Sequence, residues 1–301
     1  MNYRHAYHAG NFADVFKHLV LVYVVNYLSR KERGFRFIDT HAGTGMYDLG
    51  SIEAQKTGEW RDGIGRLLTA DKDQGSDAGR DRDPGGNALK MLSADPIIKI
   101  YLDVIRSCNA DTAGGPLKRY PGSPCLVRAL LRAQDAMVVN ELHPRDFDTL
   151  TSVFARDRQV KVLNLDGWLV PKSTLPPKER RGVILIDPPF EDAGEFGRMA
   201  RALTDGVRRF ANGTYIFWYP IKDPRPIDGF KQEIARLKLE RVIAAELFIR
   251  SPCDTDVLCG CGLMIHNPPF GLETWLEELL PALASLLGQS MQATYRLHTI
   301  V

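Results

Sequence analysis

The sequence predicts a doubly wound α/β fold, in which a largely parallel sheet is covered by helices on both faces. Seven short apolar, β-branched or aromatic runs end in glycine, proline or acidic residues, as strands buried on both faces do. Stretches with helical apolar spacing lie between most of these runs. The 301 residues are 44% hydrophobic and 25% charged, which is typical of globular chains and excludes the disordered, collagen-like and membrane classes.

The predicted elements follow one another along the chain. The strands are expected at residues 35–38, 136–139, 160–163, 183–186, 214–218, 242–245 and 263–265. The clearest helical spacing lies at residues 145–154, 196–210 and 230–238. This alternation predicts that ligands bind where the carboxyl ends of the strands meet.

The first two strands are separated by about a hundred residues, whereas a simple crossover needs roughly 10 to 15. We therefore expect an inserted helical subdomain over residues 51–107, between two parts of the main domain at 1–50 and 108–301. Residues 71–86 form a polar tract rich in glycine and aspartate, without a large apolar side chain. Such a tract buries too little surface to become ordered, so we expect a mobile loop there.

A turn of small residues, Asp39 to Gly45, follows the first strand. Its glycines Gly43 and Gly45 would let the backbone approach a ligand closely, which indicates a cofactor loop. It lacks the third glycine of the dinucleotide-binding fingerprint. A plain strand-to-helix turn is the alternative interpretation.

Carboxylates follow the next two strands, with Glu141 after the second and Asp166 after the third. Glu141 could accept hydrogen bonds from both ribose hydroxyls of a nucleoside, and Asp166 from an adenine amino group. The alternative is that both residues cap helices, a role in which aspartate is common.

The most specific motif is Asp187-Pro188-Pro189-Phe190, directly after the fourth strand. Consecutive prolines remove two backbone donors and fix the directions of the neighbouring carbonyls. The Asp187 carboxylate and the Pro188 carbonyl could each accept one hydrogen of an exocyclic amino group, while Phe190 stacks on the base. Accepting both hydrogens would expose the nitrogen lone pair for attack on an electrophilic methyl group.

A second copy of this pattern, Asn267-Pro268-Pro269-Phe270, follows the seventh strand. We interpret it as a structural turn, because Asp187 comes directly after the strands of Glu141 and Asp166. The seventh strand is expected toward the sheet edge. The opposite assignment remains open, since motif matches produce false positives.

In this order, the Asp39–Gly45 turn, Glu141, Asp166 and Asp187-Pro-Pro-Phe190 resemble the motifs of class I S-adenosylmethionine-dependent amino-methyltransferases. The N-terminal block from Tyr3 to His18 narrows the resemblance to the RlmJ family, bacterial enzymes that methylate N6 of an adenine in 23S ribosomal RNA. The likeness extends over nearly the whole chain through segments 120–124, 141–144 and 218–220. One departure is Phe190, where the family usually has tyrosine.

The resemblance implies a Rossmann-like class I methyltransferase fold with a seven-stranded sheet and an inserted helical subdomain. It implies S-adenosylmethionine as cofactor, bound by Lys17, His18, His41, Gly43, Ser123, Glu141, Asp166 and Asp187. It also implies a catalytic group formed by Asp187, Pro188, Phe190, Tyr3 and His5. Residues 1–14 would form an N-terminal lid that contacts RNA through Tyr3, Arg4 and His5.

The expected partner is 23S ribosomal RNA, although the net charge of +2 does not by itself indicate a nucleic-acid ligand. Any basic surface that binds RNA must then be confined to part of the molecule. Residues 1–36 contain six basic and two acidic side chains, and residues 198–250 contain eleven and six. Solvated helix faces would explain both clusters equally simply. A DNA adenine-N6 methyltransferase and a non-catalytic RNA-binding protein are the alternative functions.

We expect a monomer in the cytoplasm, without a metal and without a membrane span. Five cysteines do not form a disulfide framework. The apolar run 19–25 is too short to cross a bilayer, and the N-terminus lacks the layout of a signal peptide. Histidines and cysteines that could suggest zinc have no familiar ligand spacing. They are His5, His8, His18, His41, His266, Cys253, Cys259 and Cys261.

Overall fold

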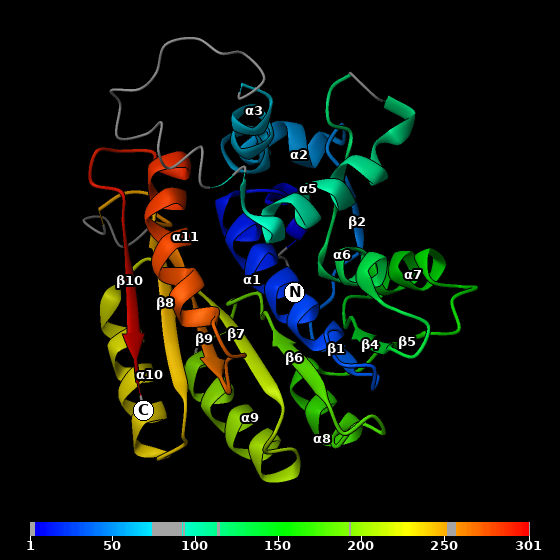
Figure 1. Cartoon of the computed structure of the whole chain (residues 1–301), viewed down its shortest axis with the longest axis vertical. Helices are drawn as coiled ribbons and strands as arrows, with labels where there is room; N and C mark the ends of the chain where they lie inside the picture. Colours follow the sequence, from blue (N-terminus) through cyan, green and yellow to red (C-terminus); the bar gives the residue numbers. More distant parts are fainter. Residues whose placement is uncertain are drawn as a thin grey trace.

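The computed structural model describes residues 4–73, 92, 94–112, 115–192, 194–251 and 257–300. An eight-stranded sheet forms its centre (Figure 1). Along the sheet the strands are β10 (Thr294–Thr299), β8 (Val242–Phe248), β9 (Gly260–His266), β7 (Thr214–Ile221), β6 (Gly182–Ile186), β1 (Arg36–Asp39), β4 (Ala136–Asn140) and β5 (Val160–Leu163).

Strands β5, β4, β1, β6 and β7 are parallel, whereas β9 is antiparallel to both its neighbours, β7 and β8. The chain starts at β1 in the middle, continues through β4 to β5 on one side, and then resumes at β6 on the other. This reversal makes β1 the switch point of the sheet. Ligands of open α/β sheets bind outside the carboxyl ends of the strands at such a point.

Each of the seven predicted strands coincides with a strand of this sheet, but the sheet has eight strands rather than seven. The additional strand, β10, pairs antiparallel with β8 at the edge. Most of its side chains are exposed. It therefore lacks the apolar run that identifies the inner strands in the sequence.

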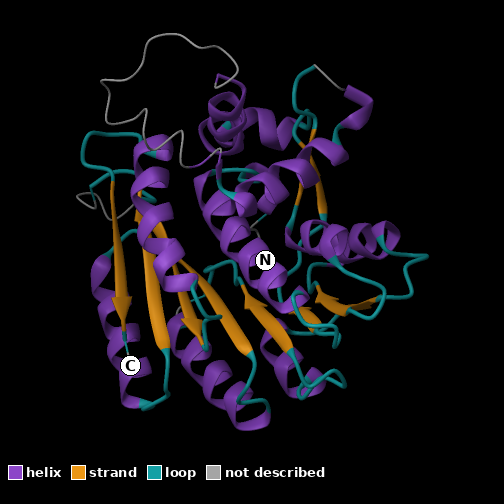
Figure 2. Cartoon of the chain, in the orientation of Figure 1, coloured by secondary structure: helices purple, strands orange, loops and turns teal. Residues whose placement is uncertain are grey.

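Helices cover both faces of the sheet (Figure 2). One face packs against α1 (Phe12–Ser29), α6 (Ser123–Leu130), α7 (Pro144–Val153) and α11 (Leu272–Leu287). The other packs against α8 (Val170–Thr174), α9 (Glu195–Arg209) and α10 (Pro224–Arg236). The three helices predicted from spacing correspond to α7, α9 and α10.

Helix α1 carries several of the predicted site residues and lies against the middle of the sheet. By length and composition it could cross a membrane, but 83% of it is buried inside the protein. That burial is the property of a core helix. Its buried side chains include Lys17 and His18, which face polar partners described below.

The long segment between β1 and α6 begins and ends with the strands of a small antiparallel pair, β2 (Met46–Asp48) and β3 (Arg119–Pro121). Between them lie α2 (Ile52–Thr57), η2 (Arg61–Gly65), α3 (Arg66–Asp73), α5 (Pro96–Cys108) and η3 (Ala110–Thr112). Buried side chains of this insertion, such as Ile64 and Tyr101, belong to the same apolar cluster as α1. Residues 74–86 of the predicted mobile loop lie outside the described residues.

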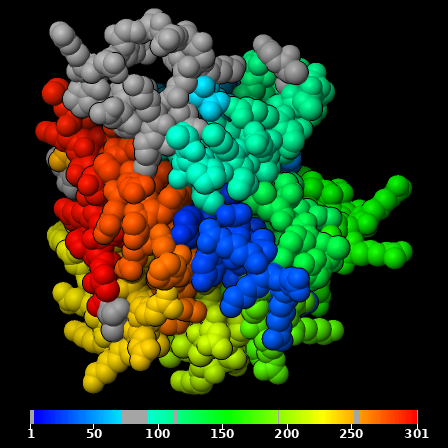
Figure 3. All heavy atoms as spheres, in the orientation of Figure 1, coloured from blue at the N-terminus to red at the C-terminus, as the bar shows by residue number. Residues whose placement is uncertain are grey.

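In the space-filling view, the blue part of the chain, which includes α1, lies between α11 (orange) and α5 (blue-green) (Figure 3). The insertion therefore lies directly beside α1. The division of the chain into two domains stays a prediction.

Candidate active site

The buried side chain of Asn140, at the end of β4, ties together the ends of three neighbouring strands. Its amide nitrogen donates to the carbonyl oxygens of Thr40 (3.0 Å) and Leu165 (2.9 Å). Its amide oxygen accepts from the Leu165 nitrogen (2.9 Å). A buried amide with its hydrogen bonds formed fixes the groups around it. The loops that carry His41 and Asp166 are thereby held beside Glu141.

The turn after β1 has the backbone geometry of a ligand-binding loop. Gly43 and Gly45 have φ angles of 61° and 80°, in the region that favours glycine. A Cβ atom on Gly43 would lie 2.1 Å from the Tyr47 hydroxyl, so only glycine fits. The Gly43 nitrogen donates to Glu141 Oε2 (2.8 Å) and joins this turn to the next strand end.

Asp39, the last residue of β1, lies beneath this turn and is fully buried. The Ser123 hydroxyl donates to Asp39 Oδ2 (2.6 Å), and the His41 nitrogen donates to Asp39 Oδ1 (3.2 Å). Burial raises the pKa of Asp39 to about 7, against the opposing effect of these two hydrogen bonds. Ser123 begins α6, so the Asp39 contact connects α6 to β1.

Glu141 lines a small cavity between the β1 turn and Asp187. Burial raises its pKa, although hydrogen bonds from the His143 and Gly43 nitrogens oppose the shift. Each carboxylate oxygen already accepts one backbone N–H and keeps a lone pair. Glu141 can therefore accept further donors from a ligand.

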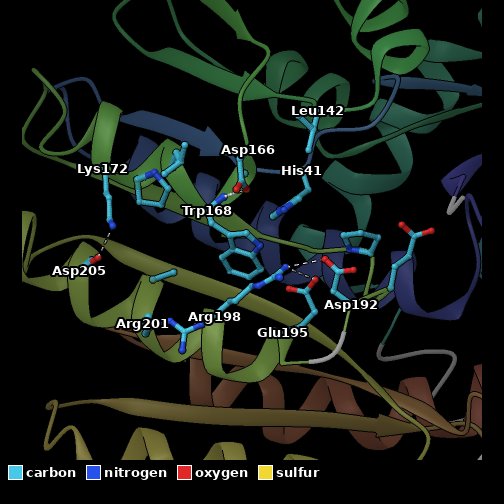
Figure 4. Close-up of a pocket in the computed structure, with 16 residues that line it drawn as sticks. His41, Leu142, Asp166, Trp168, Lys172, Asp192, Glu195, Arg198, Arg201 and Asp205 are labelled. Atoms are coloured by element: carbon cyan, nitrogen blue, oxygen red, sulfur yellow. Dashed lines mark hydrogen bonds and ion pairs between the residues drawn. The ribbon is translucent and has the colours of Figure 1, made fainter. Parts of the chain in front are cut away.

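Asp166 lies at the edge of a cavity of about 560 Å³ that continues past His41 and Pro189 (Figure 4). It is exposed and caps the short helix η4 (Gly167–Leu169) by accepting from the Trp168 nitrogen (3.0 Å). Asp166 thus caps a helix, as the alternative interpretation expects, and it also lines the cavity. Leu142 and Trp168 contribute apolar surface to the same cavity.

The two histidines of the predicted cofactor set are held neutral by burial. Burial lowers the pKa of His18 to about 3 and that of His41 to about 4. The His18 Nδ1 atom lies 2.7 Å from the Tyr120 hydroxyl, and the His41 Nδ1 atom lies 2.8 Å from Thr40 Oγ1. Both rings line the small cavity as neutral hydrogen-bonding groups.

A buried charge network connects the N-terminal segment to Asp187. The Lys17 ammonium lies 2.8 Å from Asp14 Oδ1 and 2.6 Å from Asp187 Oδ2. Asp14 Oδ2 accepts from the Gly10 nitrogen (2.9 Å) and lies 2.8 Å from His5 Nε2. Burial alone would lower the pKa of Lys17, but the two carboxylates hold it well above its ordinary value. The ammonium is therefore charged and fixed between them.

Asp187, Pro188 and Pro189 line both the small cavity and a cavity of about 710 Å³ on the other side. Phe190 lines the larger cavity and has a φ angle of 53°, which is unusual for a residue with a side chain. Its ring makes edge-to-face contacts with Phe196 and Trp218, with centroids 5.2 and 6.0 Å away. The motif thus forms a wall between the two cavities, with the Asp187 carboxylate as its charged group.

The second proline pair lies beside the amino end of β7, at the opposite end of the strands from Asp187, because β9 runs antiparallel to β7. Asn267 follows the end of β9, where the Thr214 hydroxyl at the start of β7 donates to its carbonyl (2.9 Å). This position favours the structural interpretation of Asn267, for a different reason from the expected one. Strand β9 lies inside the sheet, between β7 and β8, rather than at its edge.

The structure brings together most residues of the predicted site. Lys17, His18, His41, Gly43, Ser123, Glu141 and Asp187 line the small cavity, together with His5. Arg4 instead pairs with Glu53 of the insertion (3.0 Å), and Tyr3 lies outside the described residues. Among described residues, no group of three or more His, Cys, Asp or Glu side chains could hold a metal ion.

Sequence reasoning missed three residues that organise the site: Asn140, Asp39 and Asp14. Each was visible as part of a longer motif but had no assigned role. A polar residue within an otherwise apolar strand or helix, as Asn140 and Asp14 are, was the available signal.

The strand order, its reversal at β1 and the Asp187-Pro188 wall at the end of β6 define a class I methyltransferase. Its sheet carries one additional edge strand, β10.

The chain belongs to the family described as "Ribosomal RNA large subunit methyltransferase D, RlmJ", whose profile matches residues 32–77 and 90–301. Two curated proteins named "Ribosomal RNA large subunit methyltransferase J" are similar over 95% of this chain and 94% of their own lengths. The one from Haemophilus influenzae is 38% identical and the one from Escherichia coli 36%. A crystal structure of a Legionella pneumophila protein has a TM-score of 0.80 and 28% identity, with 97% of this chain and 98% of that chain covered.

Proposed function

We propose that this protein transfers a methyl group from S-adenosylmethionine to N6 of an adenine in 23S ribosomal RNA. The observation that carries the proposal is the position of Asp187 and Pro188 between two cavities. A cofactor on the Glu141 side and a base on the Phe190 side would meet at this wall. The relatives named as large-subunit ribosomal RNA methyltransferases support the choice of RNA.

The residues on the Glu141 side fit S-adenosylmethionine. Glu141 has the free acceptor capacity that two ribose hydroxyls need, and Gly43 lines the same cavity. Asp166 can accept from an adenine amino group in a cavity where Leu142 and Trp168 offer apolar surface to a purine. We assign the remaining cofactor contacts to Lys17, His18, His41, Ser123 and Asp187.

When bound, S-adenosylmethionine supplies an electrophilic methyl group. The adenine amino nitrogen is neutral, so no side chain needs to remove a proton before attack. As the N–CH3 bond forms, the S–CH3 bond of the donor breaks and S-adenosylhomocysteine leaves; the extra proton on N6 is then released, which gives neutral N6-methyladenosine. Asp187 and the Pro188 carbonyl accept the two amino hydrogens, and Phe190 stacks on the base. Lys17 holds the Asp187 carboxylate in one orientation, so the acceptors are fixed before the base arrives.

We assign the RNA side of the site to the N-terminal segment. The target adenine must leave its stack to reach Asp187. His5 lines the larger cavity. Tyr3 and Arg4 precede it in the sequence, and the three residue types together supply phosphate-binding and stacking groups. Residues 1–14 would act as a lid on a methyltransferase domain of residues 1–50 and 108–301, with residues 51–107 as the inserted subdomain. We further propose that the protein acts in the cytoplasm as a monomer.

Methyl transfer by the purified protein tests this function. With labelled S-adenosylmethionine and a 23S ribosomal RNA transcript, we expect N6-methyladenosine in the digested RNA. The Asp187→Asn variant should transfer about 10² to 10³-fold less. Transfer only to adenine-containing duplex DNA would identify a DNA methyltransferase instead, and RNA binding without transfer would identify a non-catalytic protein. Mass mapping of ribosomal RNA from cells with and without the gene locates the nucleotide.

A further inference from the structure

The inserted segment makes a set of polar contacts to the N-terminal segment, residues 4–11. Glu59 accounts for the central ones. Its carboxylate oxygens lie 3.0 and 3.1 Å from His8 Nδ1, and Oε2 also accepts from Asn11 Nδ2 (3.0 Å). Hydrogen bonds from His8 and Asn11 hold the pKa of Glu59 below its ordinary value, although burial opposes the shift. Glu59 is therefore an ionised carboxylate that is bound by two side chains, His8 and Asn11.

Further contacts from α2 extend this set along the N-terminal segment. Arg4 pairs with Glu53 (3.0 Å), and the Thr57 hydroxyl donates to the Tyr7 carbonyl. The Lys56 ammonium lies over the Tyr7 ring, 5.9 Å from its centroid.

A backbone contact supports the same connection independently. The Ile64 nitrogen of the insertion donates to the Gly10 carbonyl (2.9 Å). A Cβ atom on Gly63 would lie 2.1 Å from that carbonyl oxygen, so the two backbones touch at a position where only glycine fits. Gly10 itself has a φ angle of 78°, which lets the chain turn into α1.

These contacts reach the charge network beside Asp187 through Asn11 and Gly10. Asn11 caps α1, because its side-chain oxygen accepts from the Ala13 and Asp14 nitrogens (3.0 Å each). Its amide nitrogen is the group bound by Glu59, so Glu59 fixes the orientation in which the cap forms. The Gly10 nitrogen donates to Asp14, which holds His5 and Lys17.

From this chain of contacts we infer that Glu59 is a positioning residue, through which the insertion holds residues 4–11 in the geometry that sets His5 and Lys17 beside Asp187. This role rests on the proposed function, because it concerns the turnover of the same site. It gives the inserted segment a task beyond packing against α1.

The test compares Glu59→Ala with Glu59→Gln and with a matched control. Glutamine keeps an acceptor for Asn11 but loses the charge that binds His8. The control is Asp103→Ala, which removes an exposed carboxylate of the same insertion that pairs with Arg106 on its own helix. Three quantities are measured: amide hydrogen exchange of residues 5–11, cofactor affinity by calorimetry, and methyl-transfer turnover on 23S ribosomal RNA.

We expect Glu59→Ala to speed exchange across residues 5–11 and to lower kcat about tenfold, the effect of about one charge-assisted hydrogen bond. Cofactor Kd should stay within about twofold, Glu59→Gln should lie between Glu59→Ala and wild type, and Asp103→Ala should match wild type. Unchanged exchange in Glu59→Ala, or faster exchange with unchanged kcat, overturns the inference. Failure of the proposed function would look different. In that case the wild-type protein would transfer no methyl group, whatever the exchange of residues 5–11 showed.

Discussion

The Lys17 ammonium lies 2.6 Å from the Asp187 carboxylate, although the two residues are 170 positions apart. Lys17 comes from the first helix and Asp187 from the end of β6, so the contact exists only once α1 has packed on the sheet. Because Asp14 binds the other side of the ammonium, the charge of Lys17 is shared by two carboxylates. The N-terminal block and the Asp-Pro-Pro motif are therefore parts of one site.

Replacing Asp187 should abolish methyl transfer without unfolding the protein. Asp187→Asn turns one acceptor into a donor that faces the adenine amino group, so we expect turnover to fall about 10² to 10³-fold, as for loss of one preorganised polar contact. Asn267→Ala is the matched control, since it changes the same pattern at the opposite end of the strands. Full activity in Asp187→Asn, or its loss in Asn267→Ala, would reverse this assignment.

Lys17→Met should separate the structural and catalytic roles of the network. Removing the ammonium leaves the Asp14 carboxylate with only Gly10 and His5 as partners and deprives Asp187 of its cation, which should cost about 3 to 5 kcal/mol of stability. Adding Asp14→Asn removes one of these charges, so the double variant should regain part of the lost melting temperature. Its turnover should remain low, because Asp187 is still not held. A double variant with restored activity would assign Lys17 a purely structural role.

The cofactor side should respond to Glu141 and Asn140 in different ways. Glu141→Ala removes acceptors for ribose hydroxyls, so calorimetry should show weaker cofactor binding by about 1.5 to 3 kcal/mol per lost charge-assisted bond. RNA affinity should change less.

Asn140→Asp should weaken cofactor binding indirectly. It places a carboxylate against the carbonyl oxygens of Thr40 and Leu165, and so disturbs the loops of His41 and Asp166. We expect a lower melting temperature together with a higher cofactor Kd. An unchanged cofactor Kd in both Glu141→Ala and Asn140→Asp would mean that the cofactor does not bind at this part of the sheet.

The sequence predicts the inner strands and the acidic strand ends well, because both signals are local. A buried strand needs a short apolar run, and Glu141 or Asp187 stands directly after one. Strand direction is not local: Asp187 and Asn267 have nearly the same surroundings in sequence, and only the antiparallel pairing of β9 separates them. The edge strand β10 was missed because its exposed side chains leave no apolar run.

Contacts between distant segments could not be predicted from the sequence either. The Asp14–Lys17 pair is local, because the two residues are three positions apart on α1. Nothing near Lys17 in the chain indicates that its other partner is Asp187, and nothing near Glu59 indicates that it binds the cap of α1. In both cases the residue types permit many partners, and packing of the insertion and α1 selects one.

Stability should fall with rising pH through the titration of Asp39. Its folded-state pKa is raised to about 7 by burial, whereas its ordinary value is 3.8. The protonated form is favoured by folding, so its contribution is fully present below the unfolded pKa and is lost as pH rises toward 7. Linkage gives a slope of up to about 1.4 kcal/mol per pH unit between these values. Asp39→Asn keeps a neutral side chain at every pH. Melting temperatures of wild type and Asp39→Asn measured from pH 5 to 8 should therefore shift in favour of the variant as pH rises, whereas a constant difference between them would mean that Asp39 is ionised throughout.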